Sequence, residues 1–365
     1  MFFYKTFKKR FGGTNEKIMN KLTDGLHMTI YDISEKAGVS IATVSRVLNG
    51  SSNVSEKTKQ KVLDVIKQYE YTPNAFARGL GLNTMKTIGI MCADSSDLYI
   101  AKAIYYLERL LHSNGYDSIL CCRGYELETK KKSMNLLITK KVDAIILVGS
   151  TFINETEEDN KYIIDAAAQV PVMLHNGALD APNVYGILSD DFSSVYNATL
   201  YLIDSGIHDI LYYYNSMSYS GKKKMAGFKA AIQTRNLPLT DAMIQYYPGN
   251  HEDIPKMARH LKKIADNVAE FHGVIAADDT LAIGAYKYAV QAGLRIPDDF
   301  SIIGYNNSML VNCCAPALTS IDNKLESLCQ HLITTLMGCL NGCEMPKMTV
   351  FSGELIVRGT TRQPK

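Results

Sequence analysis

Three short helical segments follow one another in residues 29–71, and they constrain the fold more than any other feature of the chain. Thr29, Ser40 and Ser55 are each placed to cap one of these helices, because their hydroxyls can accept a backbone N–H of the first turn. Gly38 permits the left-handed backbone that ends the first helix. Two short helices joined by a glycine turn, followed by a third helix, predict a small all-α helix-turn-helix domain.

The second of these helices, Ile41–Leu48, has a short and polar outer face that carries Thr43, Ser45 and Arg46. Such a face suits the major groove of DNA, because hydroxyls reach phosphates and arginine reads guanine. The third helix is expected to run to about Tyr71. After it, the segment Asn74–Leu80 is too short to form a stable helix alone, and Gly79 and Gly81 weaken it further, which predicts a hinge that orders only on DNA.

These segments resemble the DNA-binding head of the lactose-repressor (LacI/GalR) family, in the runs IYDISEKAGVSIATVSRVLNG, VSEKTKQKV and YTPNAFARGL, and the resemblance continues to the C-terminus. It implies that Ile41, Ala42 and Arg46 face bases and that Leu80 wedges into the minor groove, where an apolar side chain kinks the duplex. The DNA contacts that it implies are Thr29, Tyr31, Ser40, Ile41, Ala42, Thr43, Ser45, Arg46, Asn49, Asn53, Ser55, Thr58 and Leu80. Paired hinges imply a homodimer on a pseudopalindromic operator.

Charge is distributed as a DNA-binding head requires. Residues 1–80 carry 13 Lys and Arg and 7 Asp and Glu, which gives this part a net positive charge. Residues 81–365 carry 26 Lys and Arg and 30 Asp and Glu, which gives them a net negative charge. A head that is only modestly basic favours dimerisation and salt-sensitive binding. Residues 1–27 lack the apolar run of a secretory signal, so we expect a cytoplasmic protein. We interpret these residues as a misplaced translation start, with a basic DNA-binding arm as the alternative.

From Lys86 onward, apolar runs alternate with helical patterns, which is typical of βαβ units around parallel sheets. The number of runs predicts two doubly wound parallel-sheet lobes, and the resemblance implies an effector core like the periplasmic sugar-binding proteins. Crossings between the lobes are expected near Ser189, Asn307–Val311 and Met345. The expected division is 1–27 extension, 28–73 head, 74–85 hinge and linker, and 86–365 effector and dimerisation core, with lobe 1 about 86–188 and 311–345 and lobe 2 about 189–310 and 346–365.

Ligands bind doubly wound sheets at the carboxyl ends of the strands, so polar residues that follow strands are the candidates for the effector site. Together with the resemblance, this indicates Ser96, Tyr99, His175, Asp190, Lys224, Asp278 and Asn306. The resemblance also implies that Asp278 and Asn306 exchange the acid and the amide that the family usually has at these two places. Asp279 is expected to cap the helix that follows.

Simpler interpretations of the same residues stay open. Ser96 and Asp190 can serve only as helix caps, and a lone histidine such as His175 is more often structural. Lys224 can belong to a solvated run with the two lysines before it. The eight cysteines include no C-x-x-C or Cys/His cluster, which predicts no metal and no cofactor.

The sequence therefore predicts a repressor that binds double-stranded operator DNA as a homodimer and responds to a small-molecule effector, expected to be a carbohydrate. Control by a protein corepressor is the alternative. A solute-binding protein would have a similar core, but the helix-turn-helix argues against it. An enzyme is disfavoured, because the chain has no P-loop, no G-x-G-x-x-G after the first strand and no G-x-S-x-G elbow.

Overall fold

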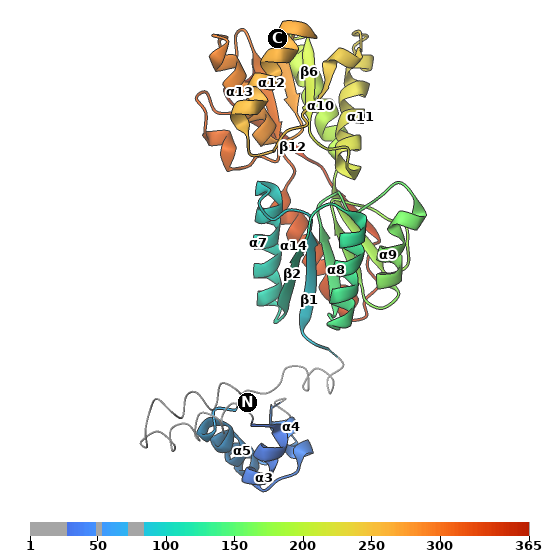
Figure 1. The fold of residues 1–365 in the computed structure, drawn as a ribbon, viewed down its shortest axis with the longest axis vertical. Helices are drawn as coiled ribbons and strands as arrows, with labels where there is room; N and C mark the ends of the chain where they lie inside the picture. The colour runs from blue at the N-terminus through green and yellow to red at the C-terminus, as the bar shows by residue number, and fades with distance from the viewer. Residues whose placement is uncertain (1–27, 49–52, 72–83, 365) are drawn as a thin grey trace, which may run out of the picture. The chain divides into compact units, whose positions relative to one another are not determined.

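The computed structural model describes residues 28–48, 53–71 and 84–364, and the chain separates into two compact units, Met1–Met85 and Lys86–Lys365 (Figure 1). Asn49, Leu80 and most of the expected hinge lie outside the described residues. No helix in the described ranges is long and apolar enough to cross a membrane.

The first unit holds the three helices expected from the capping residues. They are α3 Ile30–Ala37, α4 Ile41–Leu48 and α5 Glu56–Gln68. Thr29 and Asp32 form a reciprocal capping box, and Gly38 ends α3 at a φ of 59°. A small core buries apolar side chains of all three helices, namely Ile33, Ala37, Val44, Val47 and Val62, together with Tyr71.

The last helix of this unit is shorter than the sequence pattern predicts. α5 ends at Gln68 instead of near Tyr71, because Glu70 adopts a left-handed φ of 48°. The Tyr71 N–H then donates to the Ile66 carbonyl, and the Glu70 N–H donates to the Lys67 carbonyl. These bonds satisfy carbonyls of the last turn, which is how many helices terminate.

The second unit consists of two lobes, each built on a six-stranded sheet. The sheet of lobe 1 has the order β11-β5-β4-β3-β1-β2, and all of its neighbouring strands are parallel. Its strands are β1 Thr87–Cys92, β2 Asp117–Cys122, β3 Ala144–Val148, β4 Val172–His175, β5 Val184–Ser189 and β11 Met348–Phe351. Its helices are α7 Leu98–Ser113, α8 Leu127–Thr139, α9 Glu157–Ala167 and α14 Leu325–Leu340. One core packs under α7 and α14 and another under α8 and α9, on opposite faces of the sheet (Figure 1).

Lobe 2 has the strand order β12-β10-β9-β8-β6-β7, in which only the β10–β12 pair is antiparallel. Its strands are β6 Ile210–Tyr214, β7 Ile244–Tyr246, β8 Gly273–Ala276, β9 Ser301–Tyr305, β10 Thr319–Asp322 and β12 Glu354–Ile356. Its helices are α10 Asp191–Asp204, α11 Tyr219–Thr234, α12 Ile254–Asn267 and α13 Asp279–Gln291, with short 3-10 turns at Asp241–Met243 and Met309–Asn312. The predicted fold class, a helical head with two doubly wound parallel-sheet lobes, is confirmed.

Two of the three crossings between the lobes differ from the expectation. The first follows β5 at Ser189, where it was expected. The second lies at residues 323–324 and not at Asn307–Val311, because β10 pairs with β9 and keeps residues 319–322 in lobe 2. The third lies at residues 352–353 and not near Met345, because β11 pairs with β5 in lobe 1. Lobe 1 therefore keeps α14, as expected, gains β11, and loses residues 311–322 to lobe 2.

Candidate DNA interface and ligand cavity

The second helix of the head presents a small outward surface. α4 buries Val44 and Val47 in the core of the head and leaves Ile41, Ala42 and Arg46 exposed. Apart from Arg46, the exposed side chains of this face are short or of moderate size, so the backbone of the helix can approach a partner closely. A groove that accepts a helix, with bases at its floor, fits such a surface.

The N-termini of α4 and α5 are built alike. The Thr43 N–H donates to Ser40 Oγ over 3.2 Å, and the Thr58 N–H donates to Ser55 Oγ over 3.3 Å. In each pair the two hydroxyl oxygens lie 2.9 Å apart. The serines thus act as helix caps, and the positive end of each helix favours a phosphate nearby.

The remaining predicted contact residues of the head surround these helices. Tyr31 is 68% exposed on α3, and Asn53 is exposed before α5. Ser45 is half-buried on α4. Thr29 is engaged with the Asp32 carboxylate, and its hydroxyl holds the pKa of Asp32 below the usual value.

A cavity of about 750 Å³ lies in the second unit, at the carboxyl ends of strands of both sheets. Its walls come from the segments that follow β1, β2, β3 and β4 of lobe 1 and β6, β7, β8 and β9 of lobe 2. The lobes also bond directly beside it, where Ser150 Oγ of lobe 1 donates to Ser218 Oγ of lobe 2 over 2.8 Å. The volume and position are those of a small-molecule site.

Five of the predicted effector residues line this cavity, namely Ser96, Tyr99, Lys224, Asp278 and Asn306. The prediction was wrong in placing two others there. His175 is fully buried beneath the cavity, against the Tyr99 ring with the ring centroids 5.7 Å apart. Asp190 caps α10, where it accepts the Ser193 N–H over 3.0 Å.

The alternation of side chains along β4 explains the position of His175. It lies on the same face of the sheet as Met173, toward the core under α7 and α14. Among the described residues neither ring nitrogen has a hydrogen-bond partner, and burial lowers the pKa of His175 to about 4. The ring is therefore neutral at pH 7. The next residue, Asn176, lines the cavity instead and donates from Nδ2 to the Tyr99 hydroxyl over 3.4 Å.

Asp278, and not Asp279, caps α13, which reverses the expected roles of these neighbours. Asp278 Oδ1 accepts the Leu281 N–H over 2.8 Å, and Oδ2 lies 2.9 Å from Nε2 of His251. Asp279 is buried below, where it accepts the Ser308 N–H and the Ser320 hydroxyl, both over 2.6 Å. Burial raises the pKa of Asp279 to about 6 despite these bonds.

His251 is a cavity residue that the sequence analysis missed. Burial by itself would lower the pKa of His251, but the hydrogen bond and charge of Asp278 outweigh burial and raise it to about 9. Burial likewise opposes the ionisation of Asp278, yet His251 holds the pKa of that carboxyl below its usual value. The two side chains therefore form an ion pair at pH 7. His251 lies in an irregular segment between β7 and α12, where no pattern of the sequence singled it out.

Lys224 is buried in the wall of the cavity and does not belong to a solvated charge run. Its Nζ donates to the Ala277 carbonyl over 2.9 Å and lies 3.5 Å from the centroid of the Tyr305 ring. Burial lowers its pKa, and the carboxylates of Asp191 and Asp278 oppose that effect. The Tyr305 hydroxyl donates in turn to Asp191. Lys224 is therefore held by the Ala277 carbonyl, the Tyr305 ring and the charge of Asp191.

Two further carboxylates of lobe 1 face the cavity in the segment after β1. Asp94 Oδ1 accepts the backbone N–H and the hydroxyl of Ser96, both over 2.8 Å. Asp97 Oδ1 caps α7 by accepting the Ile100 N–H over 2.9 Å. Ser96 was expected here from the sequence, whereas the two acids were not. Among the described residues no group of three His, Cys, Asp or Glu side chains could hold a metal ion.

Comparison with known proteins links both parts of the chain to bacterial regulators. Residues 29–74 match the family model described as bacterial regulatory proteins, lacI family, and residues 199–361 match that of a periplasmic binding protein-like domain. An HTH-type transcriptional regulator of Lachnoclostridium phytofermentans is 56% identical over 92% of this chain and 99% of its own length. The HTH-type transcriptional repressor PurR of Vibrio vulnificus is 31% identical over the same shares.

Solved structures show the same fold. The lac repressor dimer bound to operator and the anti-inducer ONPF matches 92% of this chain and 99% of that chain, with a TM-score of 0.79 and 22% identity. The regulator CelR in its cellobiose complex matches 92% of this chain and all of that chain, with a TM-score of 0.65 and 22% identity.

Proposed function

Because this chain belongs to the lacI family of bacterial regulatory proteins, we propose that it is a sequence-specific transcriptional repressor whose DNA affinity is set by a small-molecule effector. The outward face of α4 carries the proposal. Its exposed Arg46 can donate two hydrogen bonds to one guanine, and the exposed Ile41 and Ala42 can contact base edges beside it. The capped N-termini of α4 and α5 would anchor the head on phosphates.

Operator binding requires two heads. One head offers a single short recognition helix and few cations, so its contacts with one half-site supply little specific affinity. A homodimer doubles these contacts and fixes their spacing, which selects a pseudopalindromic operator in cytoplasmic DNA.

The cavity between the lobes is the proposed effector site. It is lined by hydroxyl, amide and carboxylate groups and by the rings of Tyr125 and Tyr246, which suits a carbohydrate. An effector that contacts both lobes would strengthen or break bonds such as Ser150–Ser218. It can shift DNA affinity only by as much as its affinity differs between the two lobe arrangements.

Selection of DNA from a random-sequence library by the full chain tests the proposal. We expect enrichment of a two-fold symmetric motif, and its affinity should change when a panel of sugars, sugar phosphates, nucleosides and amino acids is added. Failure to enrich any motif would overturn DNA recognition. Enrichment without a response to any compound would overturn the small-molecule effector and favour a protein corepressor.

A further inference from the structure

The positive charges of the cavity wall are already compensated. Of the described residues that line the cavity, only Lys224 and His251 can carry a positive charge. His251 is paired with Asp278, and Nζ of Lys224 is held by the Ala277 carbonyl and the Tyr305 ring with Asp191 close by. An incoming anion therefore finds no cation that it could pair with unless one of these arrangements is broken.

The two carboxylates that the segment after β1 contributes to the cavity wall, in contrast, have no cation at salt-bridge distance among the described residues. Asp94 and Asp97 form no salt bridge with the described residues, and each uses one carboxylate oxygen for a local turn or cap. The second oxygen of Asp94 accepts no hydrogen bond from the described part of the chain, whereas the Tyr99 N–H acts on Asp97 in addition to the Ile100 N–H. Their negative field reaches the opposite wall, since both carboxylates contribute to raising the pKa of His251 in lobe 2.

Neutral hydroxyl groups satisfy these carboxylates better than any anion does. An ionised carboxylate only accepts hydrogen bonds, and each hydroxyl of a sugar can donate one. A phosphate group carries roughly −1.5 to −2 charges at pH 7, so it would be repelled instead. Burial raises the pKa of Asp97 and the charge of Asp278 adds to that effect, whereas the Ile100 N–H and the charge of His251 oppose it.

Two aromatic rings on opposite lobes complete the site. Tyr125 follows β2 of lobe 1 and is 59% exposed, and Tyr246 ends β7 of lobe 2 and is 50% exposed. Both line the cavity, so each lobe supplies one aromatic side chain that the apolar side of a sugar ring could contact.

We propose that the cavity takes an uncharged saccharide and that Asp94 and Asp97 exclude its phosphorylated and carboxylated forms. This inference rests on the proposed role of the cavity as the effector site. Asp94 and Asp97 determine specificity by charge, whereas the rings and the amide groups bind features that neutral and charged sugars share.

Calorimetric titration of the full chain provides the test. The neutral probes are glucose, galactose, cellobiose and lactose, and the anionic probes are glucose 6-phosphate, galactose 6-phosphate and glucuronate. We expect at least one neutral probe to bind, and its anionic counterpart to bind about tenfold more weakly or worse, since two carboxylates at close range oppose it. An anionic probe that binds as tightly as its neutral parent would overturn the proposal.

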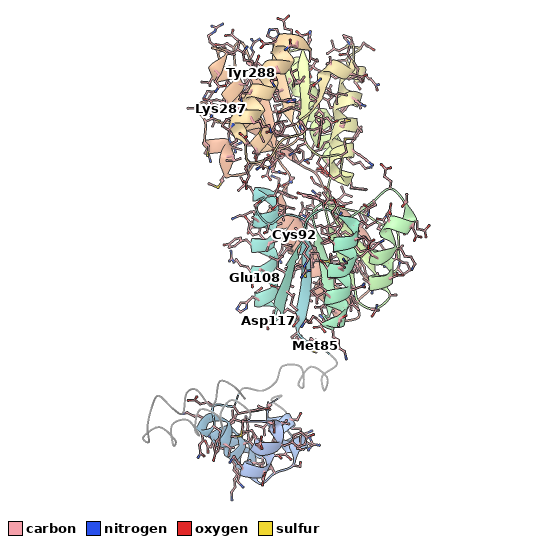
Figure 2. All side chains as sticks on the ribbon, viewed as in Figure 1. Met85, Cys92, Glu108, Asp117, Lys287 and Tyr288 are labelled. Carbon is pink, nitrogen blue, oxygen red and sulfur yellow. The ribbon has the colours of Figure 1, made fainter. Side chains whose placement is uncertain are left out.

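Variants assign the effect to the two carboxylates. Asp94→Asn with Asp97→Asn removes both charges, and asparagine can still accept the turn and cap hydrogen bonds. The double variant should still bind the neutral probe, and the ratio of the dissociation constants of the anionic and neutral probes should become smaller. The control is Asp117→Asn, which removes an exposed carboxylate far from the cavity. Figure 2 shows Asp117 at the opposite end of lobe 1 from Cys92, the last residue of β1 before the cavity segment. If this ratio is unchanged in the double variant, Asp94 and Asp97 are not the cause of the weaker binding of anionic probes.

The outcomes separate this inference from the proposed function. If no neutral or anionic probe binds, the saccharide class is wrong, while the DNA selection still decides whether the chain recognises an operator. If an anionic probe binds best and also changes DNA affinity, the cavity is still supported as the effector site, but the exclusion of anionic sugars by Asp94 and Asp97 is contradicted.

Discussion

At the scale of single residues, the ion pair of His251 and Asp278 shows how one carboxylate can serve two structures. Asp278 caps α13 with one oxygen and holds His251 with the other. Each oxygen thus already has one partner, which leaves about one further acceptor site on each for an effector.

The raised pKa of His251 predicts a pH dependence of stability. The ordinary value of 6.5 rises to about 9 in the folded chain, so the ion pair stabilises the fold fully below pH 6.5. That stabilisation is lost as the pH rises from 6.5 through 9, because the folded state then releases the proton. Urea unfolding of wild type and His251→Gln should therefore differ most at pH 6 and converge above pH 9.

Exposed His208 provides the control for this experiment, since His208→Gln should leave the same pH profile unchanged. A difference between wild type and His251→Gln that is equal at pH 6 and pH 10 would show that His251 contributes through packing and not through its charge.

The exposed arginine of α4 predicts a loss of specificity. Arg46→Ala should weaken binding to the selected operator roughly tenfold to 100-fold, because a bidentate guanine contact is worth about 1–3 kcal/mol. Binding to random DNA should fall much less. Fluorescence anisotropy with both DNAs measures the two losses, and Arg259→Ala, exposed on α12, is the matched control. Equal losses on both DNAs would make Arg46 a phosphate contact.

The candidate site could be predicted from sequence only in part. Tyr99, Lys224 and Asn306 line the cavity as expected, although their contact with an effector stays a prediction. His175 was misplaced because a residue at a strand end can face either side of the sheet. His251 was missed because its segment has no regular pattern, and only the folded chain brings it to Asp278.

At the scale of elements, the close approach of α10 and α11 depends on one glycine. A Cβ at Gly227 of α11 would lie 2.3 Å from the backbone carbonyl oxygen of Phe192 in α10. Gly227→Ala should therefore force the helices apart and lower the free energy of unfolding by about 1–3 kcal/mol. Urea unfolding measures the change.

Gly338→Ala in α14 is the matched control, because the added methyl would meet only the flexible thioether of Met345. Alanine also favours the helix by about 1 kcal/mol relative to glycine, so this variant should be close to neutral. If both variants destabilise equally, the backbone contact of Gly227 is not the cause.

The elements differ in how clearly the sequence shows them. The helices of the head were located by their caps and the inner strands by apolar runs, as at β3 and β6. No pattern in the sequence indicated β10, β11 or β12. β10 has the polar sequence TSID, and β11 and β12 are short strands at the sheet edges. Because the second and third crossings depend on these strands, they were misplaced.

At the scale of the whole molecule, the proposed dimer predicts how binding depends on salt and on operator length. Each phosphate contact contributes about −0.9 to the slope of log K against log salt, and two heads double the contacts. The full operator should therefore show a steeper slope and a much higher affinity than a half-site. Anisotropy titrations from low to high salt measure both quantities. Identical slopes for the two DNAs would argue for binding by one head.

The amino-acid sequence alone specifies the helices of the head and the alternation of strands and helices in the core. Local signals such as the caps Thr29, Ser40 and Ser55 specify the head, and apolar periodicity specifies the βαβ units, because both depend on neighbours along the chain. The lobe that receives β11, and the charges that meet in the cavity, became clear only from the folded chain. These depend on contacts between segments far apart in sequence, such as β11 with β5 and His251 with Asp278. Local patterns carry no information on which distant segment will be the partner.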